Sequence, residues 1–212
     1  LFKRFAPNDV KKNWNIVKLG FSERSSSTDK PQQKQLSFVK VVESLNGNIV
    51  KWQGEQHNGP LLVAVTGPDL NVRASLVERL QEKCFVIDTG RWDLDESQRN
   101  NSLNYPFSRI KFNDYVSALE RLQRGQTAMI PLRQTLSAEL PQRGFAILNE
   151  EIREKYKPTL VKESSKVWIR YDGQLFEELK PETSEVFIVD TSVALSYPVL
   201  RGLFKEAYLV DA

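Results

Sequence analysis

Four short apolar runs constrain the fold of this chain more than any other feature of its sequence. They begin at Leu61, Cys84, Val186 and Ala207 and read LLVAV, CFVID, VFIVD and AYLVD. Strands of a parallel sheet are covered on both faces, so they need not alternate with polar residues. Segments of helical period lie between the runs. The pattern therefore predicts an α/β domain over residues 61–212, with a doubly wound, mostly parallel sheet.

Two helices and one hairpin are expected inside this domain. The segments VRASLVERLQEK (72–83) and NDYVSALERLQRG (113–125) have helical period. In the second, Asn113 is a plausible N-cap and Gly125 a plausible stop. The segment KVWIRYDGQLFEEL (166–179) indicates a hairpin insert that turns at Asp172-Gly173.

Residues 1–60 are expected to form a separate basic extension. They hold ten Lys and Arg against five Asp and Glu, of 30 and 27 in the whole chain. Residues 6–20 favour a short amphipathic helix, and a polar linker follows. Residues 36–54 read LSFVKVVESLNGNIVKWQG, which predicts a β-hairpin around Asn46-Gly47.

The first part of this extension is predicted to dock onto partner proteins. Large aromatic side chains are costly to leave in water on an extension. Those concerned are Phe2, Phe5, Trp14 and Phe21. The basic, aromatic start of the chain is also typical of what remains after a targeting peptide is removed, so we expect import into mitochondria or another organelle. Peripheral contact with an anionic membrane is a weaker alternative.

Composition excludes several kinds of site. The single cysteine, Cys84, leaves no intramolecular disulfide and favours apolar packing, and the single histidine, His57, offers neither a metal cluster nor a catalytic triad. No apolar stretch approaches the roughly twenty residues that a membrane span requires. We therefore expect no metal, no cofactor and no transmembrane segment.

The stretch TGPDLNVRAS (66–75) stands where a phosphate-binding loop would stand, between an apolar run and a helix. A working loop of the form GxxxxGK[ST] needs a second glycine, a lysine and a hydroxyl that holds Mg²⁺. Here Val72, Arg73 and Ala74 occupy those positions, and Pro68 and Asp69 add an imino acid and a negative charge. What remains predicts weak anion binding at most, by a vestigial loop made of Gly67, Asn71, Arg73 and Ser75.

From residue 61 onward the sequence resembles the uridine kinase and phosphoribulokinase family of phosphate-loop kinases. The segment VFIVDTSVALSYPVLRGLFKEAYLVDA (186–212) carries the strongest likeness, and NYPFSRIKFNDYVSALERLQRGQTAMIPL (104–132) is similar to a second family segment. The resemblance implies a P-loop kinase fold. It also implies where catalytic groups would stand.

Those implied positions have lost their chemistry. Gly90 stands at the family's catalytic Asp and Trp92 at its aromatic residue. Asp88 or Asp93 is the nearest possible replacement. Changes occur also in the nucleoside-binding stretch (Ser102 to Pro106), in the later Pro-x-Tyr-Asp (Pro131 to Gln134) and in Glu-Gly (Asp190-Thr191), and the sequence ends at Ala212, where the family continues into an arginine-bearing lid.

These replacements predict a pseudokinase with a degenerate Walker A loop, which serves as an accessory or structural subunit of a larger assembly. Two other interpretations remain open. The chain is an active or nucleotide-sensing nucleoside-type kinase if the vestigial loop holds a nucleotide, with Asp88 or Asp190 on the metal. It is an RNA-binding accessory protein if the basic arm with Trp14 and Phe21 contacts phosphates and bases.

Overall fold

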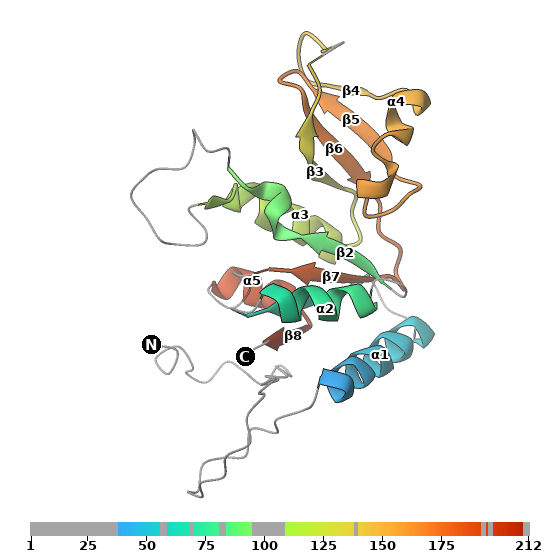
Figure 1. Cartoon of the computed structure of the whole chain (residues 1–212), viewed down its shortest axis with the longest axis vertical. Coiled ribbons are helices and arrows are strands. Elements are labelled where there is room, and N and C mark those ends of the chain that lie inside the picture. Colours follow the sequence, from blue (N-terminus) through green and yellow to red (C-terminus); the bar gives the residue numbers. More distant parts are fainter. Residues whose placement is uncertain are drawn as a thin grey trace, which may run out of the picture.

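The four apolar runs form one parallel sheet, as predicted (Figure 1). The computed structural model describes residues 38–55, 59–67, 70–80, 84–94, 109–137, 140–191, 194 and 197–209. The sheet has the order β2-β7-β1-β8. Its strands are β1 (Leu61–Thr66), β2 (Phe85–Asp88), β7 (Val186–Asp190) and β8 (Glu206–Leu209), and every pairing between them is parallel.

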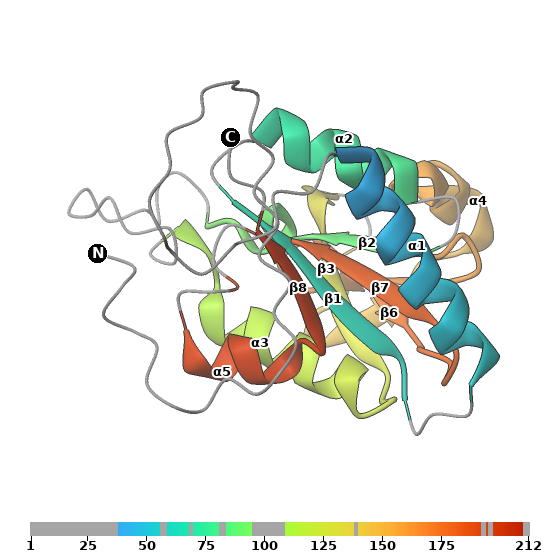
Figure 2. The same cartoon turned by 90° about the horizontal axis from the view of Figure 1, so that it is seen from below.

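Helices cover both faces of this sheet (Figure 2). On one face lie α1 (Phe38–Gly54) and α2 (Leu70–Leu80), over an apolar cluster that includes Leu45, Val63 and Ile188. On the other lie α3 (Phe112–Gln123) and α5 (Pro198–Leu203), over a second cluster that includes Leu119 and Phe187. The expected doubly wound α/β arrangement is therefore confirmed for the described residues.

A second, antiparallel sheet was not anticipated as a separate layer. Its order is β3-β6-β5-β4. The strands are β3 (Ala128–Thr135), β4 (Phe145–Ile147), β5 (Lys166–Arg170) and β6 (Gln174–Leu179). The expected hairpin at 166–179 is β5 with β6, and the turn needs Gly173: its φ is 84°, and a Cβ there would collide with the carbonyl oxygen of Leu136.

The short helices α4 (Glu150–Glu154) and η5 (Lys157–Thr159) follow β4 along the chain, and η2 (Thr89–Trp92) follows β2. The segments around α4 and η5 supply Leu148, Tyr156 and Leu160 to a third apolar cluster, built on Leu132 and Leu175 of the antiparallel sheet. This cluster occupies one face of that sheet. The opposite face contains Trp168 and Phe176, which are paired across β5 and β6.

The predicted hairpin at residues 36–54 is wrong, because α1 is a helix through Asn46-Gly47. Leu45 and Ile49 are fully buried, and Val42 and Trp52 pack beside them, at helical spacing. The amino group of Lys205 lies 4.0 Å from the centre of the Trp52 ring. Burial of this apolar stripe against the parallel sheet outweighs the local turn preference, so α1 belongs to the core and not to a detached extension.

One expected helix cap is also wrong, and one is confirmed. The N-cap of α3 is Lys111, which makes no side-chain capping bond, and Asn113 lies exposed inside the helix. Gly125 follows the helix end with a φ of 70°, as expected of a stop. The arm residues Phe2, Phe5, Trp14 and Phe21, the expected helix at 6–20, and His57 lie outside the described residues.

The expectation that Cys84 packs in the apolar core is confirmed. Cys84 is buried in an apolar cluster, its thiol donates to the carbonyl of Leu80 at 2.9 Å, and burial raises its pKa to about 12. It is therefore a packing residue and a poor nucleophile. Among the helices described, none is long and apolar enough to cross a membrane.

Candidate functional site

The loop after β1 lies at the carboxyl end of an interior strand of the parallel sheet. β1 runs between β7 and β8, and Gly67 follows it directly. The φ of Gly67 is 137°, a conformation that side chains rarely allow. α2 begins three residues later at Leu70, while positions 68 and 69 lie outside the described residues. The strand, loop and helix expected from the sequence are therefore present in that order.

Arg73 turns back onto the frame of the loop. Its Nε lies 2.9 Å from Oδ1 of Asp190, and its Nη1 donates a hydrogen bond of 2.6 Å to the carbonyl of Gly67. Only 8% of the residue is exposed. Asp190 ends β7 and is in register with Val65 of β1. The loop's cation is thus paired with a carboxylate at the edge where the parallel strands end.

The electrostatics of Asp190 follow from this position. Burial raises the pKa of its carboxyl above the ordinary value, and the charge of nearby Asp88 acts in the same direction. The guanidinium of Arg73 opposes both effects. Asp88 ends β2 and is the register partner of Asp190. Two carboxylates therefore stand side by side at the ends of adjacent strands.

Asp88 is also paired with an arginine. Its Oδ2 lies 2.5 Å from Nη2 of Arg133, which comes from β3 of the other sheet, and its Oδ1 accepts from the N–H of Gly90 at 2.8 Å. A Cβ at position 90 would collide with the same Arg133 Nη2. The guanidinium therefore occupies the space where a side chain at this position would begin.

The other residues predicted for the loop are not gathered around Arg73. Asn71, Ala74 and Ser75 are exposed on α2, and the side chain of Val72 lies outside the described part. The structure thus brings Gly67 and Arg73 together, and it places Asn71 and Ser75 on the surface of the helix that follows. Among the described residues, no group of three or more His, Cys, Asp and Glu is arranged to hold a metal ion.

The other positions implied by the resemblance differ in their exposure. Trp92 is buried, with its ring edge-on to Tyr115 at 5.1 Å, so it is part of the core. Thr191 and Pro131 are also buried, and Asp93 is exposed and forms an isolated β-bridge with Ile110. Residues 102–106, 211 and 212 lie outside the described residues.

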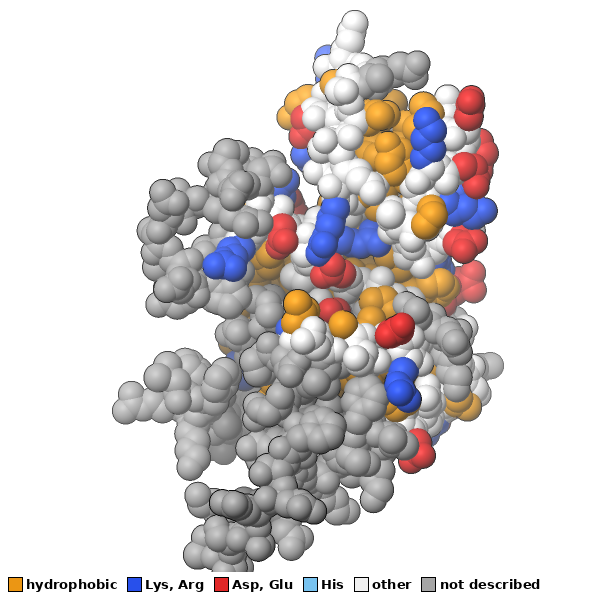
Figure 3. Space-filling model, viewed as in Figure 1, with side chains coloured by type: hydrophobic (Ala, Val, Ile, Leu, Met, Phe, Trp, Pro, Cys, Tyr) orange, Lys and Arg blue, Asp and Glu red, His pale blue; other side chains and the backbone are white. Residues whose placement is uncertain are grey.

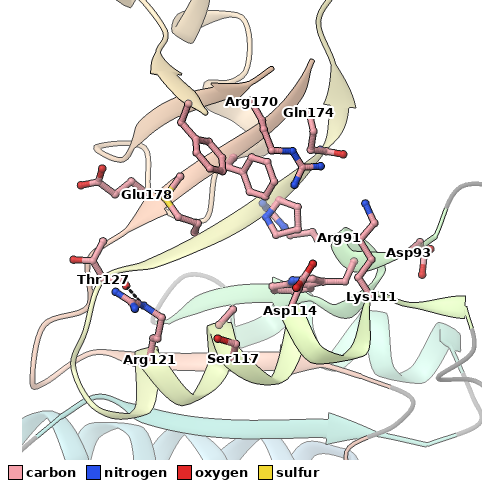
Figure 4. A pocket seen from close by; sticks show the side chains of 16 residues that line it. Arg91, Asp93, Lys111, Asp114, Ser117, Arg121, Thr127, Arg170, Gln174 and Glu178 are labelled. Atoms are coloured by element: carbon pink, nitrogen blue, oxygen red, sulfur yellow. Dashed lines mark hydrogen bonds between the residues drawn. The ribbon is translucent and has the colours of Figure 1, made fainter. Parts of the chain in front are cut away.

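A pocket of about 570 Å³ separates α3 from the open face of the antiparallel sheet (Figure 4). Asp114, Ser117 and Arg121 reach it from the helix, and Arg170, Gln174 and Glu178 from the strands. Its apolar lining includes Pro131 and Phe176. Sequence reasoning missed this pocket. The only signal was the spacing of three and seven residues that puts the three helix residues on one face of α3.

Several charged groups of the pocket already have partners. Arg121 donates to the carbonyl of Thr127 at 2.6 Å, Arg170 binds Asp172 with two hydrogen bonds, and Glu178 accepts from the indole of Trp168 at 2.7 Å. The pocket thus offers an apolar floor with a rim of both charges. That composition suits a small molecule with both polar and apolar parts.

Comparisons with known proteins show a structural likeness but no family match for this chain. Neither the known protein families nor the curated proteins provide a match. Among solved structures, one described as a possible uridine kinase from Bacillus stearothermophilus is similar, with a TM-score of 0.48, 10% sequence identity and coverage of 82% of each chain. A likeness at this level assigns neither an activity nor a substrate to the chain.

Proposed function

We propose that the chain is a non-catalytic, kinase-like subunit with a structural or accessory role in a larger assembly, in mitochondria or another organelle. The observation that supports this best is the arrangement of Arg73, which pairs with Asp190 and the Gly67 carbonyl. In a working phosphate loop the cation reaches outward to the phosphates. Here it is held by the protein itself.

The second carboxylate supports the same proposal. Phosphoryl transfer depends on cations and carboxylates that are aimed at the nucleotide and its metal. An active enzyme built from this site would need Asp88 or Asp190 on the metal. Both are engaged by arginines, Arg133 and Arg73, and position 90 has no side chain. The site therefore has the frame of a phosphate loop with its charges neutralised internally.

The pocket favours a second candidate function. The chain would then be a small-molecule sensor, and its sequence resemblance to uridine kinases suggests a nucleoside-type ligand. The ring of that ligand would lie against Pro131 and Phe176. Such a protein binds without transferring phosphate. Binding of a nucleoside without ATP would select this candidate, and Phe176→Ala should then abolish it.

Nucleotide titration tests the leading proposal. Calorimetry with ATP and Mg²⁺ should show no binding tighter than millimolar, because the loop cation is not available. The triple replacement Val72→Gly, Arg73→Lys and Ala74→Thr should raise the affinity, since it restores the glycine, the lysine and the hydroxyl. Ser75→Ala serves as the matched control on the same helix. Micromolar, metal-dependent binding by the natural chain would instead support an active kinase.

The accessory role needs a test of assembly. A truncation of residues 1–37 leaves α1 in place, so the core should remain folded. We expect the truncated chain to lose its fixed stoichiometry in the parent complex, and the full chain with Phe2, Phe5, Trp14 and Phe21 changed to Ser should behave in the same way. A truncated protein that still assembles normally would contradict the docking role of the arm.

A further inference from the structure

β4 is an outer strand of the antiparallel sheet, with β5 on one side only. The backbone N–H and C=O groups of its even-numbered residues point toward β5. The N–H of Tyr171 donates to the carbonyl of Gly144, and the N–H of Leu148 donates to the carbonyl of Val167. Backbone groups alternate in direction along an antiparallel strand. The N–H and C=O groups of Phe145 and Ile147 therefore point away from the sheet, and no partner for them is found in the described part of the chain.

The side chains at this edge are apolar and exposed. Phe145 is 48% exposed and Ile147 is 51% exposed, on the same face of the sheet. The Phe145 ring packs edge-on against Phe176, with 5.4 Å between centroids, so its position is fixed. Figure 3 shows hydrophobic side chains at the surface over this sheet, with charged groups at their margin. An open edge of this kind is a ready template for another strand.

The sequence around β4 is complementary to itself when reversed. Residues 143–150 read RGFAILNE. In an antiparallel alignment of two copies about Ala146, Phe145 lies opposite Ile147 of the second copy, and the reverse holds by symmetry. Arg143 then lies near the first turn of the second copy's α4, which begins with Glu150. Both residues are exposed, and the carboxylate of Glu150 also pairs with Arg153 of its own α4. In this register the outward backbone groups, the apolar side chains and the opposite charges come together.

We propose that the edge of β4 binds a second copy of this chain, by antiparallel pairing of the two β4 strands around a two-fold axis. The two antiparallel sheets then form one continuous sheet. Because β4 has only three residues, the interface is smaller than that of a standard stable dimer. The dimer should therefore be weak and dissociate on dilution. The proposal does not depend on whether the chain binds nucleotide or joins a larger assembly.

Sedimentation of the full chain over a concentration series tests the dimer. We expect a monomer–dimer equilibrium whose dissociation constant rises about tenfold or more in Ile147→Lys, because two symmetric cross-strand contacts are lost and two charges are added at the edge. Val50→Lys is the matched control, since Val50 is 59% exposed on α1, away from this sheet. It should leave the equilibrium unchanged, and both variants should melt as the natural chain does.

A charge exchange tests the register. Arg143→Glu and Glu150→Arg should each weaken the dimer, and the double variant should recover it, because the proposed register brings the two positions together across the axis. Replacing Glu150 removes its ion pair with Arg153, but Arg153 keeps its bonds to the carbonyls of Ser165 and Glu163, so α4 stays anchored. A double variant no tighter than either single variant would overturn the register.

Amide hydrogen exchange gives the most local measurement. The amides of Phe145 and Ile147 should become protected as the concentration rises, while that of Ala146, which already faces β5, should change little. A chain that stays monomeric at all concentrations overturns the proposal. The proposal is also overturned if the chain is monomeric and Ile147→Lys changes its affinity for a single-stranded RNA oligonucleotide. The edge of β4 would then be a nucleic-acid contact.

Discussion

Arg73 occupies the lysine position of a phosphate loop, and its guanidinium serves the fold instead. The sequence was sufficient to single out Arg73 and Asp190 as chemically informative positions. It did not predict that they pair with each other, because the contact depends on two strands and a helix meeting at one sheet edge. The pairing of Asp88 with Arg133 escaped prediction for the same reason, since Arg133 belongs to a sheet that was not expected.

Arg73→Ala should destabilise the protein by about 2–4 kcal/mol, because it leaves the largely buried carboxylate of Asp190 without its cation. Burial already raises the pKa of Asp190, and loss of Arg73 raises it further. In the pH range between the carboxyl's ordinary pKa and its raised pKa, the folded state binds the Asp190 proton more tightly than the unfolded state does. The free energy of unfolding therefore falls as pH rises through this range. The loss should therefore be larger near pH 7 than near pH 4 by urea unfolding. A loss no greater than that of Ser75→Ala would indicate a free, ligand-binding arginine.

At the scale of elements, the predictions succeeded where burial alone decides. The runs at Leu61 and Val186 are strands covered on both faces, and an uninterrupted apolar run is sufficient to indicate that. The sequence predicts a hairpin in place of α1 because Asn46-Gly47 is a strong local turn signal. The helix forms because Leu45 and Ile49 are buried against the parallel sheet, a contact that the local sequence does not show. β4 has three residues and little pattern of its own, so only its pairing with β5 defines it.

Gly47→Ala should stabilise the protein by about 0.5–1 kcal/mol, because glycine is costly inside a helix. A Cβ at this position meets nothing within 4 Å, so the gain is not offset by a clash. Gly173→Ala is the opposite control, since its φ is 84° and its Cβ would strike the Leu136 carbonyl. Thermal unfolding of both variants checks the pair. Destabilisation by Gly47→Ala would mean that this segment turns and does not continue as a helix.

At the scale of the whole molecule, one buried ion pair ties the two sheets together. Arg91 follows β2 of the parallel sheet, and its Nη1 lies 3.6 Å from Oε2 of Glu177 in β6. Glu177 is fully buried and also accepts from the N–H groups of Val161 and Lys162, at 2.8 and 2.9 Å. Arg91 donates further to the carbonyl of Thr159 at 2.6 Å. Through this pair the segment after β2 is joined to the segments packed on the antiparallel sheet.

Glu177→Ala should loosen the antiparallel sheet while leaving the parallel sheet folded. The variant leaves a buried guanidinium and two backbone N–H groups without their acceptor, a loss of about 3–5 kcal/mol. Because these bonds join the segment after β2 to β6 and to residues 161–162, the penalty should fall on that junction, and amides of β5 and β6 should exchange faster than those of β1 and β7. Glu178→Ala, the neighbour on the opposite face, removes one partly exposed contact to Trp168 and should cost much less. Uniform acceleration of exchange in both sheets would show that they unfold as one unit and that the ion pair does not define a boundary between them.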